Sequence, residues 1–203
     1  IIDATIVPAP RQRNSRDDNA TVKSGKTPAE WEKKPAKNRQ KDKDARWTKK
    51  HGRAHFGYKN HISIDRRHKL VRRYAVSSAS VHDSQKFDDV LDANNTASGV
   101  WADSAYRSRE TEEKLAARGM TSHIHRRGSR NKPLTKRQEA ANKTRSKVRA
   151  RVEHVFGNQH NSMGGKLVRT IGIVRATVKI GIQNLAYNMR RLVVLERSAL
   201  AVG

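Results

Sequence analysis

The chain has 203 residues, enough for one domain with a hydrophobic core and a sizeable insertion. Lys and Arg number 44 against 19 Asp and Glu, a formal net charge of +25, which opposes compaction unless a polyanion such as nucleic acid neutralises it. The lack of cysteine excludes disulfides and thiolate metal sites, and no apolar run approaches the roughly 20 residues needed to span a bilayer.

Residues 1–7 form the first expected strand, because Ile, Thr and Val dominate them and Pro8 and Pro10 follow. Asp3 lies inside this β-branched run. A buried carboxylate costs several kcal/mol unless it is paired or binds a metal, so Asp3 is a candidate functional residue. The chain begins within the strand and has no initiator Met, so we expect that an N-terminal part is missing.

Residues 8–55 differ sharply from this strand in composition. They carry 15 Lys and Arg against 6 acids, a net charge of +9, and few apolar side chains. We expect an exposed basic insertion that is disordered in part. Trp31 and Trp47 indicate that the insertion docks on protein or DNA where it is ordered.

A hairpin follows the insertion. Residues 56–64 alternate apolar and polar side chains, the pattern of a half-buried strand, and residues 70–77 alternate less cleanly. A polar turn from Asp65 to His68 separates the two strands.

Helical spacing returns over residues 84–94, and four turn-forming residues end that helix: Asn94, Asn95, Thr96 and Gly99. A second helix is expected over residues 108–118, with acids near its N-terminus and Gly119 as its C-cap. Residues 120–125 read as a short, polar edge strand.

Between these two helices, the apolar residues 100–102 form a short strand that ends at one carboxylate, Asp103. Two interpretations stay open. Ser104, Ser108 and Asp103 all suit the start of a helix, so Asp103 can be a simple cap. A carboxylate at a strand end, with Asp3 in a second strand, instead indicates a metal site.

The longest helix before the C-terminus is expected over residues 135–159. Its apolar stripe consists of Val148, Val152, Val155 and Phe156. Glu153 lies at the edge of this stripe and can face a groove beside the sheet. Residues 126–151, which lead into the helix and include most of it, carry 11 Lys and Arg and a single acid, a net charge of +10.

After a break at residues 158–165, a last helix is expected over residues 171–195. Five apolar side chains share one of its faces, which we expect to belong to the core rather than to lie on a membrane: Val178, Ile182, Leu185, Met189 and Leu192.

The order of strands and helices predicts an α/β fold with a central mixed sheet and helices on its faces. If the first strand runs beside the strand at Val100, Asp3 and Asp103 are neighbours, and the long helix can bring Glu153 to the same edge. Three carboxylates without Cys favour Mg²⁺ or Mn²⁺. Two such ions roughly 4 Å apart can clamp a phosphodiester during in-line displacement, so DNA or RNA is the natural substrate.

At these residues the chain resembles the DDE transposases of bacterial insertion sequences. The segments that resemble the family run in its order over nearly the whole chain: IDATIVPAPRQRN, PAKNRQKDKDARWTKK, FGYKNHISID, SSASVHDSQ, ADSAYRSRE and RARVEHVFG. The resemblance implies an RNase H-like mixed five-stranded sheet, with the basic insertion after its first strand. It also implies that Asp3, Asp103 and Glu153 are the catalytic triad and hold two divalent cations.

The resemblance further implies DNA contacts and a homodimer working on paired element ends. Arg149 matches the arginine of the signature around the glutamate, whereas Ser146 and His160 stand where the signature has tyrosine and lysine. The resemblance also implies an end-recognising region upstream of Asp3, which we expect to be missing from this sequence. The cations expected to contact DNA are Arg149, Arg151, Arg126, Arg127, Arg107, Lys49 and Lys50.

Several candidate functional residues also have a simpler structural interpretation. His123 and His125 share one face of a strand and could bind a metal, but no third ligand has matching spacing. Asp83 is either an acid supporting the site or a helix N-cap. Arg149 and Glu153 could form a plain surface ion pair. The basic face of residues 126–151 could be merely solvated.

Two functions therefore remain in view. The first is a DNA transposase that cleaves strands at element ends and transfers them into target DNA. The second is a basic nucleic-acid-binding protein without catalysis, including an inactive transposase remnant. No signal-peptide pattern is present, so we expect a cytoplasmic protein. The resemblance further implies a bacterial protein associated with the nucleoid.

Overall fold

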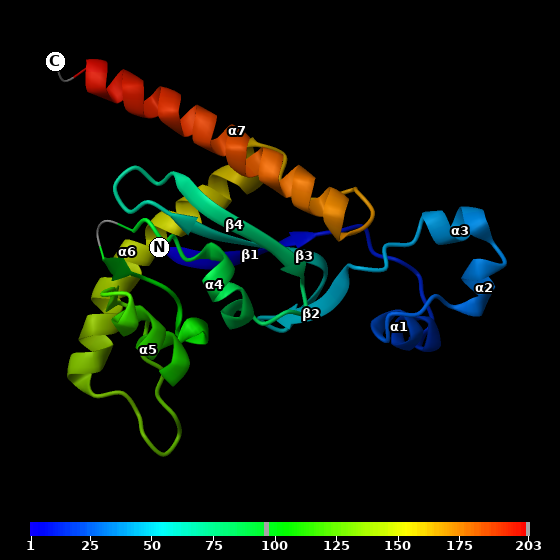
Figure 1. Cartoon of the computed structure of the whole chain (residues 1–203), viewed down its shortest axis with the longest axis horizontal. Coiled ribbons are helices and arrows are strands. Elements are labelled where there is room, and N and C mark those ends of the chain that lie inside the picture. Colours follow the sequence, from blue (N-terminus) through cyan, green and yellow to red (C-terminus); the bar gives the residue numbers. More distant parts are fainter. Residues whose placement is uncertain (96–97, 202–203) are drawn as a thin grey trace.

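An antiparallel sheet of four strands forms the centre of the computed structural model, which describes residues 1–95 and 98–201 (Figure 1). The strands are β1 (Ile2–Pro8), β2 (Arg46–Lys50), β3 (Arg53–Ile64) and β4 (Val71–Ser78). β3 pairs with all three others: β2 joins its first half, and β1 and β4 join its second half. The first strand and the hairpin expected from the sequence are confirmed. Thr96, expected in the break before Val100, lies outside the described residues.

A second, smaller sheet consists of the parallel pair β5 (Gly99–Val100) and β6 (Thr121–Ser122). A single backbone hydrogen bond, from the amide of Ile2 to the carbonyl of Trp101 at 2.8 Å, links the segment after β5 to β1. The six strands of the described residues thus pair as two sheets, and the expected single five-stranded sheet is not observed. The fold is α/β, as predicted.

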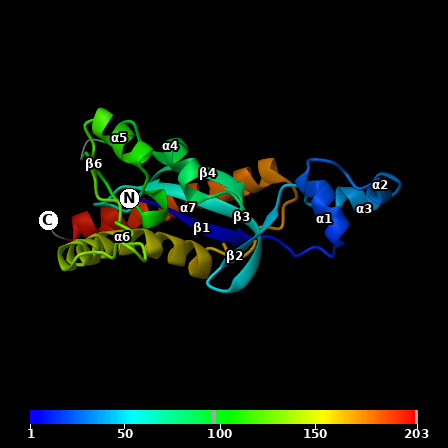
Figure 2. The same cartoon turned by 90° about the horizontal axis from the view of Figure 1, so that it is seen from below.

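The basic insertion contains three short helices, α1 (Arg16–Lys23), α2 (Ala29–Glu32) and α3 (Pro35–Arg39), which extend from one end of the sheet (Figures 1 and 2). Trp31 is 1% exposed inside this unit. Buried Asp42 accepts a hydrogen bond from the Tyr58 hydroxyl of β3 at 2.5 Å, which ties the insertion to the sheet. The basic composition suggested partial disorder, but a single buried tryptophan is enough to organise this small unit, which has few other apolar side chains. Trp47 remains 42% exposed and packs against Phe56.

One face of the sheet is covered by a 3₁₀ turn, η1 (Asp83–Lys86), followed by α4 (Phe87–Val90), and by α5 (Arg109–Ala117). The helix expected over residues 84–94 ends early, because Leu91 adopts an extended backbone and turns its side chain into the core. α5 agrees with expectation: Ser108 caps its start, and Gly119 follows its end with φ +65°. The core on this face includes Ile2, Phe87, Val90, Tyr106 and Leu115.

The other face is covered by two long helices, α6 (Lys136–Ser162) and α7 (Ile173–Leu200). Thr135 and Gln138 form a capping box at the start of α6. Val152 and Val155 of α6 are fully buried against Ile62 of β3, so the predicted apolar stripe is confirmed. α6 continues three residues past the predicted end at residue 159. No helix within the described residues has the length and apolar character needed to cross a bilayer.

The prediction for α7 was wrong about which face is buried. The buried residues are Ala176, Ile180, Asn184 and Tyr187, whereas the five apolar residues assigned to the core are all about half exposed or more. The sheet side of α7 uses small and polar groups, which an apolar pattern cannot detect. Tyr74 of β4 lies so close to Gly181 that any side chain there would collide with its hydroxyl.

A buried amide network replaces apolar packing on that side. Asn184 of α7 exchanges hydrogen bonds with Asn60 of β3 at 3.0 and 3.2 Å, and it accepts a third from Gln159 of α6 at 2.8 Å. All three residues are at most 4% exposed. The network therefore fixes both long helices to the central strand by specific bonds.

Candidate active site

Asp3 and Asp103 come together from two separate parts of the chain. Asp3 lies in β1, and Asp103 follows β5 at the segment that bonds to Ile2. Each carboxylate is oriented by the next backbone amide: Asp3 accepts from Ala4 at 2.8 Å and Asp103 from Ser104 at 2.6 Å. Asp103 also caps the 3₁₀ turn η2 (Ser104–Tyr106), so the capping interpretation is confirmed.

Arg149 of α6 lies against both carboxylates. One guanidinium nitrogen is 2.9 Å from Asp3 Oδ2, and another is 3.7 Å from Asp103 Oδ1. Its side chain is only 14% exposed, and that of Asp3 is 17% exposed. Arg149 thus pairs with these two acids and not, as one interpretation had it, with Glu153 four residues later. The Arg149 guanidinium is thus a positive charge shared by Asp3 and Asp103.

Burial dominates the electrostatics of Asp3. Desolvation raises the pKa of the Asp3 carboxyl, and the nearby Arg149 guanidinium and the Ala4 amide only partly oppose that rise. The ionised form is therefore held at a cost in free energy. Such a group gains from any additional positive charge beside it.

His125 adjoins the acid pair from a strand-like segment after β6. Its amide bonds to the carbonyl of Ala102, which brings its ring to 3.9 Å from Asp103 Oδ1. Burial, then the charge of Arg149, lowers the pKa of His125, which favours the neutral ring. Ser146, at the position of the signature tyrosine, has its hydroxyl 3.5 Å from His125 Nε2.

His123, two residues earlier, has a different environment. It stacks on Trp101 at a centroid distance of 4.4 Å, and Arg66 lies over the same indole at 5.0 Å. The two histidines considered together in the sequence thus have separate neighbours, and only His125 reaches an acid of the pair.

Tyr106 lies behind the acid pair and was missed by sequence reasoning. Its side chain is 1% exposed, and its hydroxyl has no hydrogen-bond partner within the described residues. Burial raises the pKa of this phenol, and the charges of Asp3, Asp83 and Asp103 raise it further. The one feature of the sequence that could have identified Tyr106 was its position three residues after Asp103.

Glu153 does not join the pair. It is exposed on α6, one helical turn after Arg149. In residues 1–95 and 98–201, no group of three His, Asp or Glu side chains is arranged to hold a metal ion. The structure therefore brings together two of the three predicted acids and leaves the third apart.

The donor set of the acid pair fits a divalent ion in part. Two carboxylates are hard oxygen ligands of the kind that Mg²⁺ and Mn²⁺ prefer. They already converge on one cationic group, the Arg149 guanidinium. A complete site needs a further ligand, and Glu153 would have to approach to supply it.

The predicted DNA-contacting cations fall into two groups. Three are engaged within the protein: Arg149 with the acids, Arg151 with the carbonyl of Arg66 at 2.7 Å, and Arg107 with the carbonyl of Ile124 at 2.9 Å. The other four are exposed: Arg126, Arg127, Lys49 and Lys50. Asp83 is held by Lys59 at 2.8 Å.

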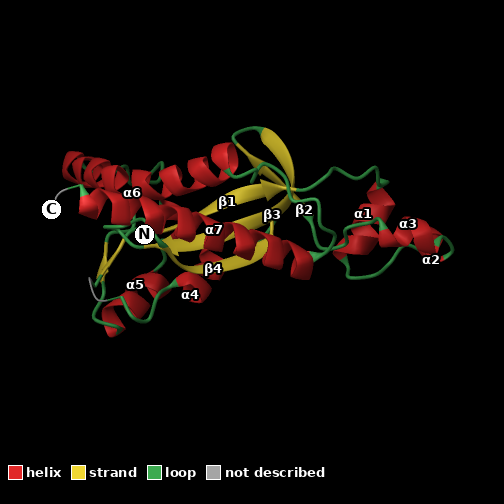
Figure 3. Cartoon of the chain, turned by 90° about the horizontal axis from the view of Figure 1, so that it is seen from above, coloured by secondary structure: helices red, strands yellow, loops and turns green. Residues whose placement is uncertain are grey.

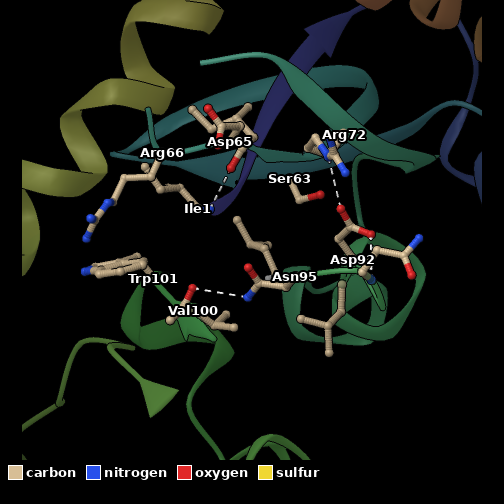
Figure 4. Close-up of a pocket in the computed structure, with 14 residues that line it drawn as sticks. Ile1, Ser63, Asp65, Arg66, Arg72, Asp92, Asn95, Val100 and Trp101 are labelled. Atoms are coloured by element: carbon tan, nitrogen blue, oxygen red, sulfur yellow. Dashed lines mark hydrogen bonds and ion pairs between the residues drawn. The ribbon is translucent and has the colours of Figure 1, made fainter. Parts of the chain in front are cut away.

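A cavity of about 180 Å³ opens beside the start of β1, and residues that precede the two acids, Ile2 and Trp101, are among those that line it (Figure 4). Asp65, Arg66, Arg72, Asp92 and Trp101 line it, and the Arg72–Asp92 ion pair at 3.1 Å spans part of its wall. Neither Asp3 nor Asp103 lines this cavity. The acid pair is thus not part of this cavity.

Comparison with known proteins identifies a family and curated relatives. The model of the transposase DDE domain matches residues 1–189. A transposase for insertion sequence element IS1106 from Neisseria meningitidis serogroup B is 28% identical over 193 residues, covering 93% of this chain and 63% of the relative. The chain thus spans less than two thirds of that relative's length. No solved structure matches the chain. The chain belongs to the transposase DDE domain family, the DDE transposases of insertion elements.

Proposed function

We propose that Asp3 and Asp103 form the centre of a metal-dependent enzyme that cleaves DNA strands at element ends and transfers them into target DNA. The observation that carries this proposal is the meeting of the two carboxylates at one guanidinium, at 2.9 and 3.7 Å, from distant parts of the chain. Placing a largely buried acid, Asp3, beside a second acid has little structural benefit, whereas two adjacent carboxylates are what binding of a catalytic metal needs. We further propose an RNase H-like arrangement, supported by the bond from Ile2 to Trp101 beside β5.

The proposed cofactors are two Mg²⁺ or Mn²⁺ ions, held by Asp3, Asp103 and Glu153. When bound, such ions polarise a phosphodiester and lower the pKa of bound water. The chain's own groups fix the geometry: the amides of Ala4 and Ser104 orient the two aspartates. Glu153 lies on the helix that carries Arg149, so a small adjustment of α6 would alter both residues together.

Arg149 is proposed to act as an internal counter-cation that a metal ion displaces. Replacing it, as in Arg149→Gln, is expected to raise the affinity of the acid pair for Mn²⁺ at least about tenfold, since a hydrogen bond to a charged group contributes about 1.5–3 kcal/mol. Isothermal titration with Mn²⁺ measures this. Arg145→Gln is the matched control, because Arg145 contacts the carbonyl of Ile124 and neither acid. Unchanged or weaker affinity in Arg149→Gln would refute displacement.

DNA is the proposed partner, contacted by the exposed cations of the two basic stretches, residues 8–55 and 126–151. Binding to a random duplex should weaken steeply with salt, each neutralised phosphate contributing about −0.9 to the log–log slope. Arg127→Glu is expected to flatten that slope by about one. Arg109→Glu is the control, since Arg109 is 93% exposed on α5, outside both stretches. A shallow wild-type slope, or equal effects of the two variants, would indicate a merely solvated surface.

The alternative, a DNA-binding protein without catalysis, has two observations in its favour. Glu153 is exposed and apart from the acid pair, and Arg149 occupies the pair. Incubation of supercoiled plasmid with Mn²⁺, and with EDTA as control, separates the two functions. Nicked product that disappears with EDTA favours the enzyme, and tight binding without nicking favours the alternative.

A further inference from the structure

Five large apolar side chains form an exposed row along α7, which we call the α7 seam: Val178 57%, Ile182 58%, Leu185 61%, Met189 62% and Leu192 49% exposed. Figure 3, seen from above, shows α7 in front of the sheet with no other element of the described chain over it. A folded monomer rarely exposes so long an apolar row, and such patches mark interaction sites.

The spacing of the seam identifies the shape of what covers it. Successive seam residues are four, three, four and three positions apart, the 3.5-residue repeat of a coiled-coil interface. A repeat of that period stays in line along a neighbouring helix instead of drifting around the cylinder. The seam therefore fits a second helix running alongside α7.

The two ends of the seam carry opposite charges. Arg175 precedes Val178 by three residues, and Glu196 follows Leu192 by four, so both continue the same repeat, and both are exposed. A parallel copy of α7 would place Arg175 beside Arg175 and Glu196 beside Glu196. An antiparallel copy instead brings Arg175 of each chain to Glu196 of the other, so the row is self-complementary about a two-fold axis near Leu185.

The flanks of the seam allow two highly basic chains to approach. Next to the row, one side carries Lys179, Ala186 and Val193, and the other carries Gly181, Asn188 and Leu195. Only Lys179 is charged, in a protein of net charge +25. This neutral strip is thus a place where a second copy meets little like charge.

We propose that the α7 seam binds the α7 seam of a second copy of this chain, antiparallel, in a two-fold dimer. From Arg175 to Glu196 the contact would extend about 30 Å at 1.5 Å per residue. The inference concerns assembly and does not depend on the proposed cleavage chemistry. It names the surface through which the expected homodimer forms.

Sedimentation of the nuclease-treated chain at high salt tests the dimer, because salt dissolves DNA-bridged complexes but not apolar contacts. Leu185→Glu should raise the dissociation constant at least about 30-fold, as expected for loss of a central interface residue. Val194→Glu adds the same charge to the same helix off the seam and should leave the dimer intact; Val194 is 48% exposed. Circular dichroism melting of both variants verifies folding, since neither residue is buried.

A charge swap tests the orientation. Arg175→Glu and Glu196→Arg should each weaken the dimer, and the double variant should restore it, which a parallel pairing does not predict. The chain has no cysteine, so Leu185→Cys provides a single thiol that should form a disulfide-linked dimer on oxidation, whereas Val194→Cys should not. A monomeric wild-type chain, or a dimer that Leu185→Glu leaves unchanged, would overturn the proposal and leave the seam to a different helix.

Discussion

Asp103→Asn is expected to reduce metal-dependent nicking of supercoiled DNA more than about 100-fold, since even partners outside the ligand shell of a metal typically contribute 10–100-fold. Asparagine retains the oxygen that accepts the Ser104 amide, so the turn should keep its shape. DNA affinity should stay the same or rise slightly, because one negative charge facing phosphate is removed. Plasmid nicking in Mg²⁺ or Mn²⁺ measures the loss.

Glu139→Gln is the matched control for this substitution. It removes one carboxylate from the exposed first turn of α6, away from the acid pair, and should leave nicking unchanged. Nicking by Asp103→Asn at a rate comparable with wild type would show that Asp103 is not a metal ligand.

Asn184→Ala is expected to give the largest loss of stability. It removes the shared partner of Asn60 and Gln159, and each buried polar group left unpaired costs about 1–3 kcal/mol. A total loss of about 3 kcal/mol or more corresponds to a fall in Tm of roughly 6–12 °C for a chain of this size. Thermal unfolding followed by circular dichroism measures the shift.

Asn161→Ala, an exposed amide near the end of α6, controls for the change of residue type and should shift Tm little. Equal shifts in the two variants would mean that the buried network contributes no specific stability.

The proximity of Asp3 and Asp103 was predictable from the sequence, because each acid lies at a defined position in or at the end of a strand-like segment. Asp3 in the first strand and Asp103 at the end of an apolar approach become neighbours once the two segments lie side by side, as the bond from Ile2 to Trp101 shows. Glu153 was less predictable, because a helix residue depends on the rotation and tilt of the whole helix. In this structure Arg149 takes the place beside the acids.

The contacts of Arg149, His125 and Tyr106 could not be read from the sequence for a related reason. Each meets the acid pair through long-range packing, and Arg149 is 146 residues from its partner Asp3. The buried face of α7 was predicted wrongly for another reason. Asn184 and Tyr187 are buried because they find hydrogen-bond partners, whereas apolar periodicity identified a face that the rest of the described chain leaves open.

The most direct test of the proposed metal centre is a crystal structure of this chain with Mn²⁺, examined by anomalous scattering. We predict manganese peaks at the carboxylates of Asp3 and Asp103, with Arg149 withdrawn from them and Glu153 turned toward the metal. A crystal of Asp3→Asn treated in the same way should lose these peaks. Saturating Mn²⁺ with no peak at the acid pair, and Arg149 still bound to Asp3, would contradict the metal-dependent centre.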